Sequence, residues 1–249
     1  MKYMGSKSKI AKDIIPIIQS FITDNTVGYL EPFVGGANVI DKIDCNIKVG
    51  CDKQKYLIAL LQNLDKLHTL PKIITKEHYS DVRDCYNTGN KNVKYEDWYI
   101  GAIGFLSSYN GRFFDGGYAG IVKTKIGNER NYYAEAKKNL ENQIKDLYGI
   151  RFFNKEYNEI NKNISGWVIY CDPPYKNTKQ YGSSKGFNHD DFWEWCRVMS
   201  KNNIVIISEQ EAPVDFKCIW EQDVNRTIDN KKSVRVTEKL FIYTGESTI

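Results

Sequence analysis

The sequence predicts an α/β fold, in which a mainly parallel sheet carries helices on both faces and a mainly helical lobe is inserted into the chain. Short apolar runs, each followed by a turn with glycine, proline or an acid, are typical of buried parallel strands. Helical patterns separate these runs, as crossover connections between parallel strands require. Near the carboxyl end, residues 216–220 and 233–243 predict a terminal antiparallel strand pair.

Length and composition limit the class of protein. The chain has 249 residues, of which 41% are hydrophobic, enough for one large α/β domain with an inserted lobe. No run of 18 apolar residues and no secretory segment is present, so we expect no membrane span. The six cysteines form no Cys-x-x-Cys pair and the three histidines no cluster. We therefore expect reduced thiols, no metal site, and a cytoplasmic protein.

The chain opens with a short segment before its first predicted helix, whose buried face carries isoleucines from Ile10 to Ile18. Ser6 is the predicted N-cap of this helix. A Gly-Ser pair that enters a helix offers free backbone N–H groups to an anion, and Lys7 stands where it can meet a carboxylate. Taken alone, this stretch favours the alternative, an ordinary helix start with a surface lysine.

A glycine-rich turn follows the first predicted strand, residues 28–30, and is predicted to lead into a helix. Glycines at 35 and 36 let the backbone approach a ligand, although the turn matches neither the dinucleotide pattern nor a phosphate-binding loop. The next strand, 47–52, ends in Asp52, 17 residues beyond Gly35. An acid near this spacing holds ribose hydroxyls in such folds. The alternative is that Asp52 caps the helix predicted over residues 53–64.

Residues 67–147 predict an inserted lobe, with helices near 78–86, 95–107 and 132–147, whereas 1–66 and 148–249 form the catalytic domain. Glycines, aromatic residues and basic residues alternate in the middle of this lobe, which suits contact with bases and phosphates. The alternative is a helical lid that only covers a cofactor. The candidate DNA contacts are Tyr109, Asn110, Arg112, Lys123, Lys125 and Arg130.

The second half of the chain returns to the sheet pattern. It predicts strands at 151–153, 167–171 and 203–208, and a helix over 190–200 that Asn188 caps. Residues 176–186 form a polar loop rich in Ser, Gly and Lys, a candidate mobile clamp. The loop predicted between the last two strands is basic, with Arg226, Lys231 and Lys232.

The sequence Asp172-Pro173-Pro174-Tyr175 follows the strand at 167–171. Two prolines cannot continue a strand ladder, so the chain must turn at the carboxyl end of the strand, where α/β sheets bind ligands. The Asp172 carboxylate beside the Pro173 carbonyl offers two acceptors to the N–H groups of an exocyclic amine, which frees the lone pair of the nitrogen. Tyr175 can stack on the base, worth about 1–3 kcal/mol. A base in a duplex reaches such a corner only when it is flipped out.

Residues 2–7, 31–36 and 172–175, with Tyr109-Asn110-Gly111, resemble the motifs of the Dam-like DNA adenine-N6 methyltransferases, which use S-adenosylmethionine. The resemblance implies a Rossmann-like methyltransferase sheet and a target-recognition lobe. It further implies that Tyr3 and Lys7 contact the cofactor, Lys7 near its carboxylate. One departure is Ala37, where the family usually carries a glycine. By the same resemblance, Phe33 and Gly35 line the cofactor path and Asp52 holds the ribose. The catalytic corner around the flipped adenine is formed by Asp172, Pro173, Pro174 and Tyr175. Asp172 also lies near the cofactor.

The resemblance predicts direct transfer of the sulfonium methyl group of S-adenosylmethionine to adenine N6 in double-stranded DNA, with no metal. Cytosine N4, RNA adenine and a protein glutamine amide are alternative acceptors, since each presents an amine or amide N–H pair. A catalytically silent DNA-binding subunit is a further alternative. We expect a monomer that binds double-stranded DNA and no membrane, with a restriction endonuclease as a partner of the same system.

Overall fold

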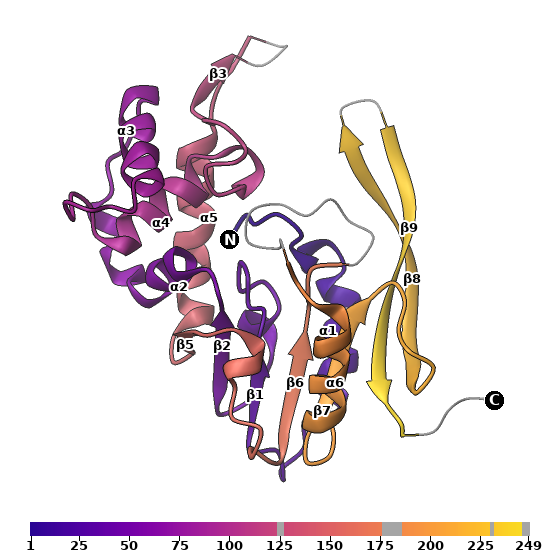
Figure 1. Cartoon of the computed structure of the whole chain (residues 1–249). Coiled ribbons are helices and arrows are strands. Elements are labelled where there is room, and N and C mark those ends of the chain that lie inside the picture. The colour runs from indigo at the N-terminus through magenta and orange to yellow at the C-terminus, as the bar shows by residue number, and fades with distance from the viewer. Residues whose placement is uncertain (124–126, 176–185, 230–231, 246–249) are drawn as a thin grey trace.

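A computed structural model describes residues 1–123, 127–175, 186–229 and 232–245, with only the backbone described at 226–229 and 232–234. Its centre is a seven-stranded sheet of order β5-β2-β1-β6-β7-β9-β8 (Figure 1). The first five strands in this order are parallel to one another, and β9 is antiparallel to both of its neighbours, β7 and β8. This arrangement confirms the predicted fold class. The strands are β1 (Gly28–Glu31), β2 (Lys48–Asp52), β5 (Arg151–Asn154), β6 (Trp167–Cys171), β7 (Ile204–Glu209), β8 (Phe216–Asp229) and β9 (Lys232–Tyr243).

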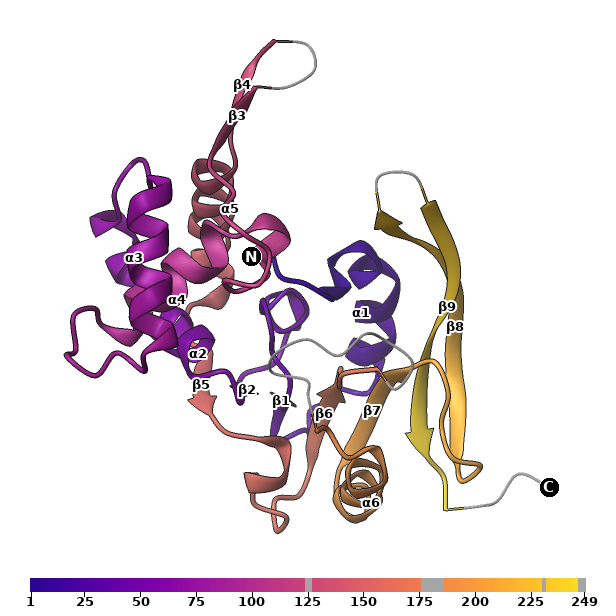
Figure 2. The same cartoon turned by 45° about the horizontal axis from the view of Figure 1, so that its top comes forward.

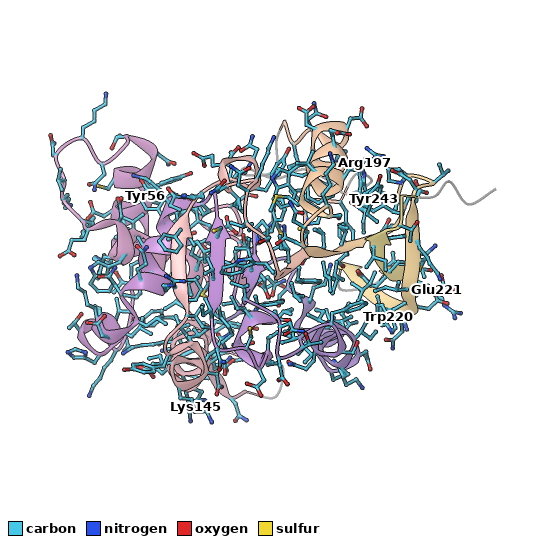
Figure 3. All side chains as sticks on the ribbon, turned by 90° about the horizontal axis from the view of Figure 1, so that it is seen from below. Tyr56, Lys145, Arg197, Trp220, Glu221 and Tyr243 are labelled. Atoms are coloured by element: carbon cyan, nitrogen blue, oxygen red, sulfur yellow. The ribbon has the colours of Figure 1, made fainter. Side chains whose placement is uncertain are left out.

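Helices cover both faces of this sheet. α1 (Ala11–Ser20) and α5 (Tyr132–Leu147) lie on one face and α6 (His189–Met199) on the other, so the labelled Lys145 and Arg197 stand on opposite sides in Figure 3. Side chains that alternate along a strand point to opposite faces. The core is therefore two clusters: Tyr29, Val168, Tyr170, Ile206 and Leu240 pack on the side of α1 and α5, and Leu30, Ile169, Cys171, Val205 and Ile207 on the side of α6.

One predicted helix start is confirmed, and three other local expectations are wrong. Asn188 caps α6 by accepting hydrogen bonds from two backbone N–H groups. Ser6 caps a 3-10 helix, Lys7–Lys9, and not α1, whose N-cap residue is Ile10. The residue that caps α2 (Lys55–Gln62) is Gln54, not Asp52. The helix predicted after the glycine turn is only a short 3-10 helix, Ile40–Lys42, because the chain soon continues into β2.

The middle of the chain contains α3 (Lys76–Asn87) and α4 (Asp97–Leu106), preceded by a 3-10 helix, Leu64–Thr69. It also contains a hairpin that the sequence did not predict, β3 (Ile121–Lys123) with β4 (Glu129–Asn131). All three residues of β3 are exposed, so no buried side chain marks this strand in the sequence. α5 begins and ends at the predicted residues, 132 and 147.

Two hairpins rise from the end of the molecule at which β1, β2 and β6 finish (Figures 1 and 2). One is β3–β4, and the other is the outer part of β8–β9. β9 pairs with β7 only over residues 239–242 but with β8 along its length. The predicted terminal pair is thus longer than expected, and Arg226 and Lys232 lie in strands rather than in a loop, whereas Lys231 falls outside the described residues.

A short 3-10 helix, Tyr157–Glu159, links β5 to β6. All six cysteines lie in the described part of the chain and are free thiols. No helix within those described ranges combines the length and the apolar character that crossing a membrane needs. The predicted clamp at 176–186 lies outside the described residues apart from Gly186.

Candidate active site

The glycine turn after β1 is fastened to the end of β2. The backbone N–H of Val34 donates to the carbonyl of Cys51 at 2.8 Å, and that of Gly35 donates to Oδ2 of Asp52 at 3.1 Å. Because β1 and β2 are parallel neighbours, both of their carboxyl ends meet at one edge of the sheet. The structure therefore brings together Gly35 and Asp52, as their spacing predicted.

Asp52 is a partly buried carboxylate whose oxygens already accept two backbone hydrogen bonds, from Gly35 and, at 2.9 Å, from Gln54. Burial raises the pKa of Asp52, and the two N–H donors oppose this shift. An ionised carboxylate has about four lone-pair sites, so its oxygens can still accept hydroxyl groups of a ligand. This is the chemistry that a ribose diol requires.

The turn has an alanine where backbone conformation favours glycine. Gly35 and Ala37 have φ of +47° and +54°, in the left-handed region. An L-residue with a Cβ is strained there by about 1–2 kcal/mol. Ala37 is fully buried, so its methyl packs into the core rather than toward the ligand edge. The turn therefore keeps its shape despite the departure from the family pattern.

The corner after β6 is built around a buried lysine. Nζ of Lys7 lies 2.9 Å from Oδ1 of Asp172 and 3.4 Å from Oε2 of Glu238. The Lys7 side chain is 6% exposed, and Asp172 is 21% exposed. Burial lowers the pKa of Lys7, but the negative charge of Asp172 and its other neighbours outweighs burial and raises it. Lys7 is thus a fixed cation, which excludes the surface-lysine alternative.

Tyr175 is held by its hydroxyl in the same cluster. The hydroxyl donates to Oε2 of Glu238 at 2.7 Å, lies 2.9 Å from Oγ of Ser208, and accepts from Nζ of Lys7. Nζ also lies 4.2 Å from the centre of the Tyr175 ring, a cation–π contact. The ring is 5% exposed, so the structure describes a state in which it offers no open face to a base. Burial, with the charges of Asp172 and Glu238, raises the pKa of the phenol far above its usual range.

Sequence reasoning missed Ser208 and Glu238, the partners that β7 and β9 contribute to this cluster. A serine or glutamate in a strand has no motif around it and no unusual spacing. The alternation of side chains along a strand could have identified Glu238. It lies two residues before the core residue Leu240 and therefore on the same buried face of β9. A carboxylate at such a position is rare without a charged partner.

Tyr3 links the glycine turn to the corner after β6. Its ring lies against Gly35, since a Cβ on that glycine would be 3.0 Å from the ring. Burial and the charges of Asp52 and Asp172 raise the pKa of the Tyr3 phenol. The structure thus gathers Tyr3, Gly35, Asp52 and Asp172 at the carboxyl edge of the sheet.

Phe33 lies apart from this cluster of charges, whereas Glu31 is buried close enough to it for the charge of Asp172 to act on its carboxyl group. Phe33 packs among aromatic rings on the α6 side, with its ring centre 5.7 Å from that of Tyr157. Glu31 is 2% exposed and accepts a hydrogen bond from the Tyr29 hydroxyl at 2.8 Å. Burial raises the pKa of Glu31 well above its usual range, which favours the neutral acid. Pro173 is buried and Pro174 half-buried, as expected of a rigid corner.

Tyr109, Asn110 and Gly111 form a 3-10 turn that packs on the start of the chain. Gly111 has a φ of +65°, and a Cβ there would lie 2.4 Å from the carbonyl oxygen of Lys2. Tyr109 is 47% exposed and Asn110 also has a left-handed backbone. The turn therefore presents two exposed side chains while its glycine contacts the segment that carries Tyr3.

The basic candidates of the lobe lie at its surface. Lys123 is exposed on β3, and Arg112 donates to Asp115 at 3.1 Å. Arg130 on β4 forms a bidentate ion pair with Glu135, in which Nε and Nη2 each lie 2.8 Å from a carboxylate oxygen. Lys125 lies outside the described residues. No group of three or more His, Cys, Asp or Glu side chains in the described ranges is arranged to hold a metal ion.

The fold and this cluster define an α/β protein with a candidate site at the carboxyl edge of a parallel sheet. The chain belongs to the D12 class N6 adenine-specific DNA methyltransferases, whose family model matches residues 3–202. It is therefore an adenine-specific DNA methyltransferase, with DNA as substrate and a methyl donor as cosubstrate.

The chain is 25% identical over 247 residues to the type II methyltransferase M.MjaIII of Methanocaldococcus jannaschii, a match covering 87% of this chain and 85% of that protein. It is 26% identical over 259 residues to the type II methyltransferase M.FokI of Planomicrobium okeanokoites, covering 98% of this chain and 38% of that protein. The Retron Ec67 DNA adenine methylase of Escherichia coli is 24% identical over 233 residues, covering 84% and 77% of the two chains.

A solved structure of a putative RNA methyltransferase, PH1948 from Pyrococcus horikoshii, superposes with a TM-score of 0.27 at 17% identity. The match covers 45% of this chain and 57% of that chain.

Proposed function

We propose that this chain transfers the methyl group of S-adenosylmethionine to N6 of an adenine flipped out of double-stranded DNA, with Asp172 as the principal acceptor for the amine. The observation that carries this proposal is the meeting of the Gly35–Asp52 turn and the Asp172 corner around Tyr3. A purine amine and a methyl donor must lie side by side, and here the two candidate half-sites share one tyrosine.

The residues at the edge suit S-adenosylmethionine by their chemistry. Asp52 keeps acceptor capacity for a ribose diol, Gly35 brings backbone close to the ligand, and the ring of Tyr3 offers a flat apolar surface. Lys7 is the candidate partner of the amino-acid carboxylate, and Phe33 lines the path in this proposal. When bound, the cofactor supplies an activated methyl group on a sulfonium, so no metal is part of the proposed mechanism.

At the corner, Asp172 and the Pro173 carbonyl accept the two N–H bonds of the adenine amine. An exocyclic amine is a poor nucleophile because its lone pair is delocalised into the ring. Two acceptors favour a pyramidal nitrogen and stabilise the positive charge that develops on it. Asp172 already receives an ion pair from Lys7 through Oδ1, and a carboxylate has capacity for further donors.

We propose two roles for Tyr175, one in the state that the structure describes and one after the ring becomes exposed. Its hydroxyl locks the corner to β7 and β9 in the state seen here. Stacking on a flipped adenine, with Pro174 completing the rigid corner, requires the ring to gain exposure first. Base flipping and Tyr175 exposure are therefore coupled in this proposal.

The division of the chain belongs to the same proposal. Residues 1–66 and 148–249 carry catalysis and residues 67–147 recognise DNA. Exposed Tyr109, Asn110 and Lys123 support this assignment, as do the surface positions of Arg112 and Arg130, and Lys125 is included from the sequence. We also propose a type II system with a restriction endonuclease partner, which the names of two relatives support. A monomeric state and a cytoplasmic location complete the proposal.

The test follows labelled methyl transfer from S-adenosylmethionine to duplex DNA, with sequencing of modified bases. Asp172→Asn is expected to lower kcat by about 10²-fold or more, because the charged acceptor is lost. Asp24→Asn, at an exposed carboxylate before β1, is the matched control and is expected to leave kcat unchanged. Full activity of the Asp172 variant, or label found on cytosine instead of adenine, would refute the proposed chemistry.

A further inference from the structure

Glu238 is a buried carboxylate with no place in the motifs of the chain. It lies in β9, is 3% exposed, and has Oε2 2.7 Å from the Tyr175 hydroxyl and 3.4 Å from Nζ of Lys7. Carboxylates are seldom fully buried unless a cation neutralises them. The ammonium of Lys7 contacts both carboxylates, Asp172 and Glu238.

The position of Glu238 follows from strand alternation. Glu238 and Leu240 point to the same face of β9, where Leu240 packs with Ile206 and Tyr170 beneath α1. β9 pairs with β7 at Ser208 and Leu240, which brings Ser208 to the same end of the sheet. Glu238 thus reaches the ligand edge from the strand beyond β7, on the side from which Lys7 arrives.

The sharing of one ammonium has an electrostatic consequence for Asp172. Nζ of Lys7 lies 2.9 Å from Asp172 and 3.4 Å from Glu238, so both carboxylates attract the same ammonium. A carboxylate that receives less of a cation's charge binds donated hydrogens more strongly. A stronger acceptor suits a reaction in which positive charge moves onto the target amine.

We propose that Glu238 is a positioning residue that sets the acceptor strength of Asp172 by drawing the ammonium of Lys7 partly toward itself, while its bond to Tyr175 fixes the corner. This inference rests on the proposed role of Asp172 as the acceptor for the adenine amine. It assigns to β9 a part in the reaction that neither the Asp-Pro-Pro-Tyr corner nor the glycine turn contains.

The other titratable groups around the cluster favour their neutral forms. Tyr170 on β6 and Tyr175 after it have pKa values that burial raises well above the usual range, and the same holds for Tyr3. Glu31 on β1 has a pKa that burial raises strongly. Lys7, which contacts both carboxylates, is therefore the charged side chain that links Asp172 to Glu238.

The decisive variant is Glu238→Gln, which keeps an acceptor for the Tyr175 hydroxyl and removes only the charge. The measurement is kcat for methyl transfer against pH, at saturating S-adenosylmethionine and DNA. Without the charge of Glu238, Lys7 interacts more strongly with Asp172, which then ionises at lower pH. The acid limb of the profile of kcat against pH is therefore expected to shift to lower pH by about one unit. The plateau is expected to fall about tenfold because Asp172 becomes a weaker acceptor, while KM for the cofactor changes less than about twofold.

Two further variants separate charge from packing. Ser208→Ala removes an uncharged hydrogen-bond partner of the Tyr175 hydroxyl without altering any charge, so its acid limb is expected to stay at the wild-type pH. Glu238→Asp keeps the charge on a shorter arm and is expected to give an acid limb between those of wild type and Glu238→Gln. A merely structural role for Glu238 predicts no such ordering.

The inference is overturned if the acid limb of Glu238→Gln coincides with that of wild type, or if Ser208→Ala moves it equally. Circular dichroism melting checks that each variant folds. Should Glu238→Gln fail to fold, the Glu238→Asp profile decides, because an acid limb and plateau identical to wild type contradict the inference. Failure of the proposed function shows differently, as an Asp172→Asn variant that keeps its activity beside an intact Glu238.

Discussion

Nζ of Lys7 lies 2.9 Å from Oδ1 of Asp172, so the start of the chain and the corner after β6 form one buried ion pair. The two residues were expected at the same site but in separate roles, Lys7 with the cofactor and Asp172 with the target amine. Their contact means that the cation near the cofactor also tunes the acceptor. Binding of a cofactor carboxylate by Lys7 would therefore change the electrostatics of Asp172, which couples the two halves of the site.

Lys7→Met is expected to destabilise the protein and to abolish most activity. Removing one partner of a buried ion pair costs about 3–5 kcal/mol, because the remaining carboxylates lose their only described cation within 4 Å. The pKa of Lys7 is raised on folding, so its contribution is fully present below its ordinary pKa and is lost as pH rises through the raised value. Urea unfolding at pH 7 and above pH 10 measures the difference from wild type.

Lys9→Met is the matched control, since Lys9 is exposed in the same 3-10 helix. It is expected to change the free energy of unfolding by less than about 0.5 kcal/mol. Equal losses in the two variants would contradict the buried ion pair.

Asp52→Asn is expected to stabilise the folded chain at neutral pH while weakening cofactor binding. Burial raises the pKa of Asp52 on folding, so the contribution of this group to stability is greatest in acid and is lost as pH rises through the raised pKa. The variant should therefore melt higher than wild type at pH 7 but not in strong acid. KM for S-adenosylmethionine should rise about tenfold or more, since a hydrogen bond to a charged group contributes about 1.5–3 kcal/mol.

Calorimetry with the cofactor and thermal melts at both pH values check this prediction. A lower melting temperature at pH 7 would show that the carboxylate stabilises the glycine turn more than its burial costs.

Gly111→Ala is expected to destabilise the protein by about 1–3 kcal/mol more than Gly89→Ala. Both glycines have left-handed backbones, with φ of +65° and +74°. A Cβ at position 111 would lie 2.4 Å from the carbonyl oxygen of Lys2, whereas nothing lies within 4 Å at position 89. Urea unfolding measures the free energy of unfolding of both variants, and the difference between their losses reports the close contact apart from the backbone strain. Equal losses would contradict the close packing of this turn on the N-terminal segment.

Arg130→Gln is expected to weaken DNA binding at the lobe and to reduce the slope of log Kd against log salt by about 0.9, the value for one phosphate contact. Arg130 stands on β4, in a hairpin that rises from the ligand end of the sheet (Figure 2). Lys201→Gln is the control, because Lys201 is exposed in the turn after α6 at the opposite end of the sheet. Binding measured by fluorescence anisotropy at several salt concentrations decides, and identical slopes for wild type and Arg130→Gln would remove Arg130 from the interface.

The sheet was predictable because its strands carry their own evidence. β6 is a run of buried residues that two prolines must end, and β1 and β2 end in glycine and acid turns. Spacing alone placed Gly35 and Asp52 at one edge, since parallel strands share their carboxyl ends. The resemblance added the roles of Tyr3 and Asp172.

The β3–β4 hairpin and the length of β8 were not predictable in the same way. β3 has three exposed residues, and a strand without a buried face has no period to detect. The cap of α2 is Gln54 because Asp52 turns its carboxylate to the backbone of Gly35 and Gln54 instead. Competition between local capping and a contact made across strands is decided only when both strands are in place.

The existence of the central strands, the rigid corner and the acid at the end of the second strand were set by local sequence, because they depend on hydrophobic period, proline geometry and glycine freedom. The sharing of Lys7 between Asp172 and Glu238, and the capture of the Tyr175 hydroxyl by Ser208 and Glu238, were decided by tertiary structure. These contacts join residues up to 231 positions apart, Lys7 and Glu238, and nothing near either residue identifies its partner. Only the pairing of β9 with β7, and the packing of the first helix under both, brings the second carboxylate within reach of the lysine.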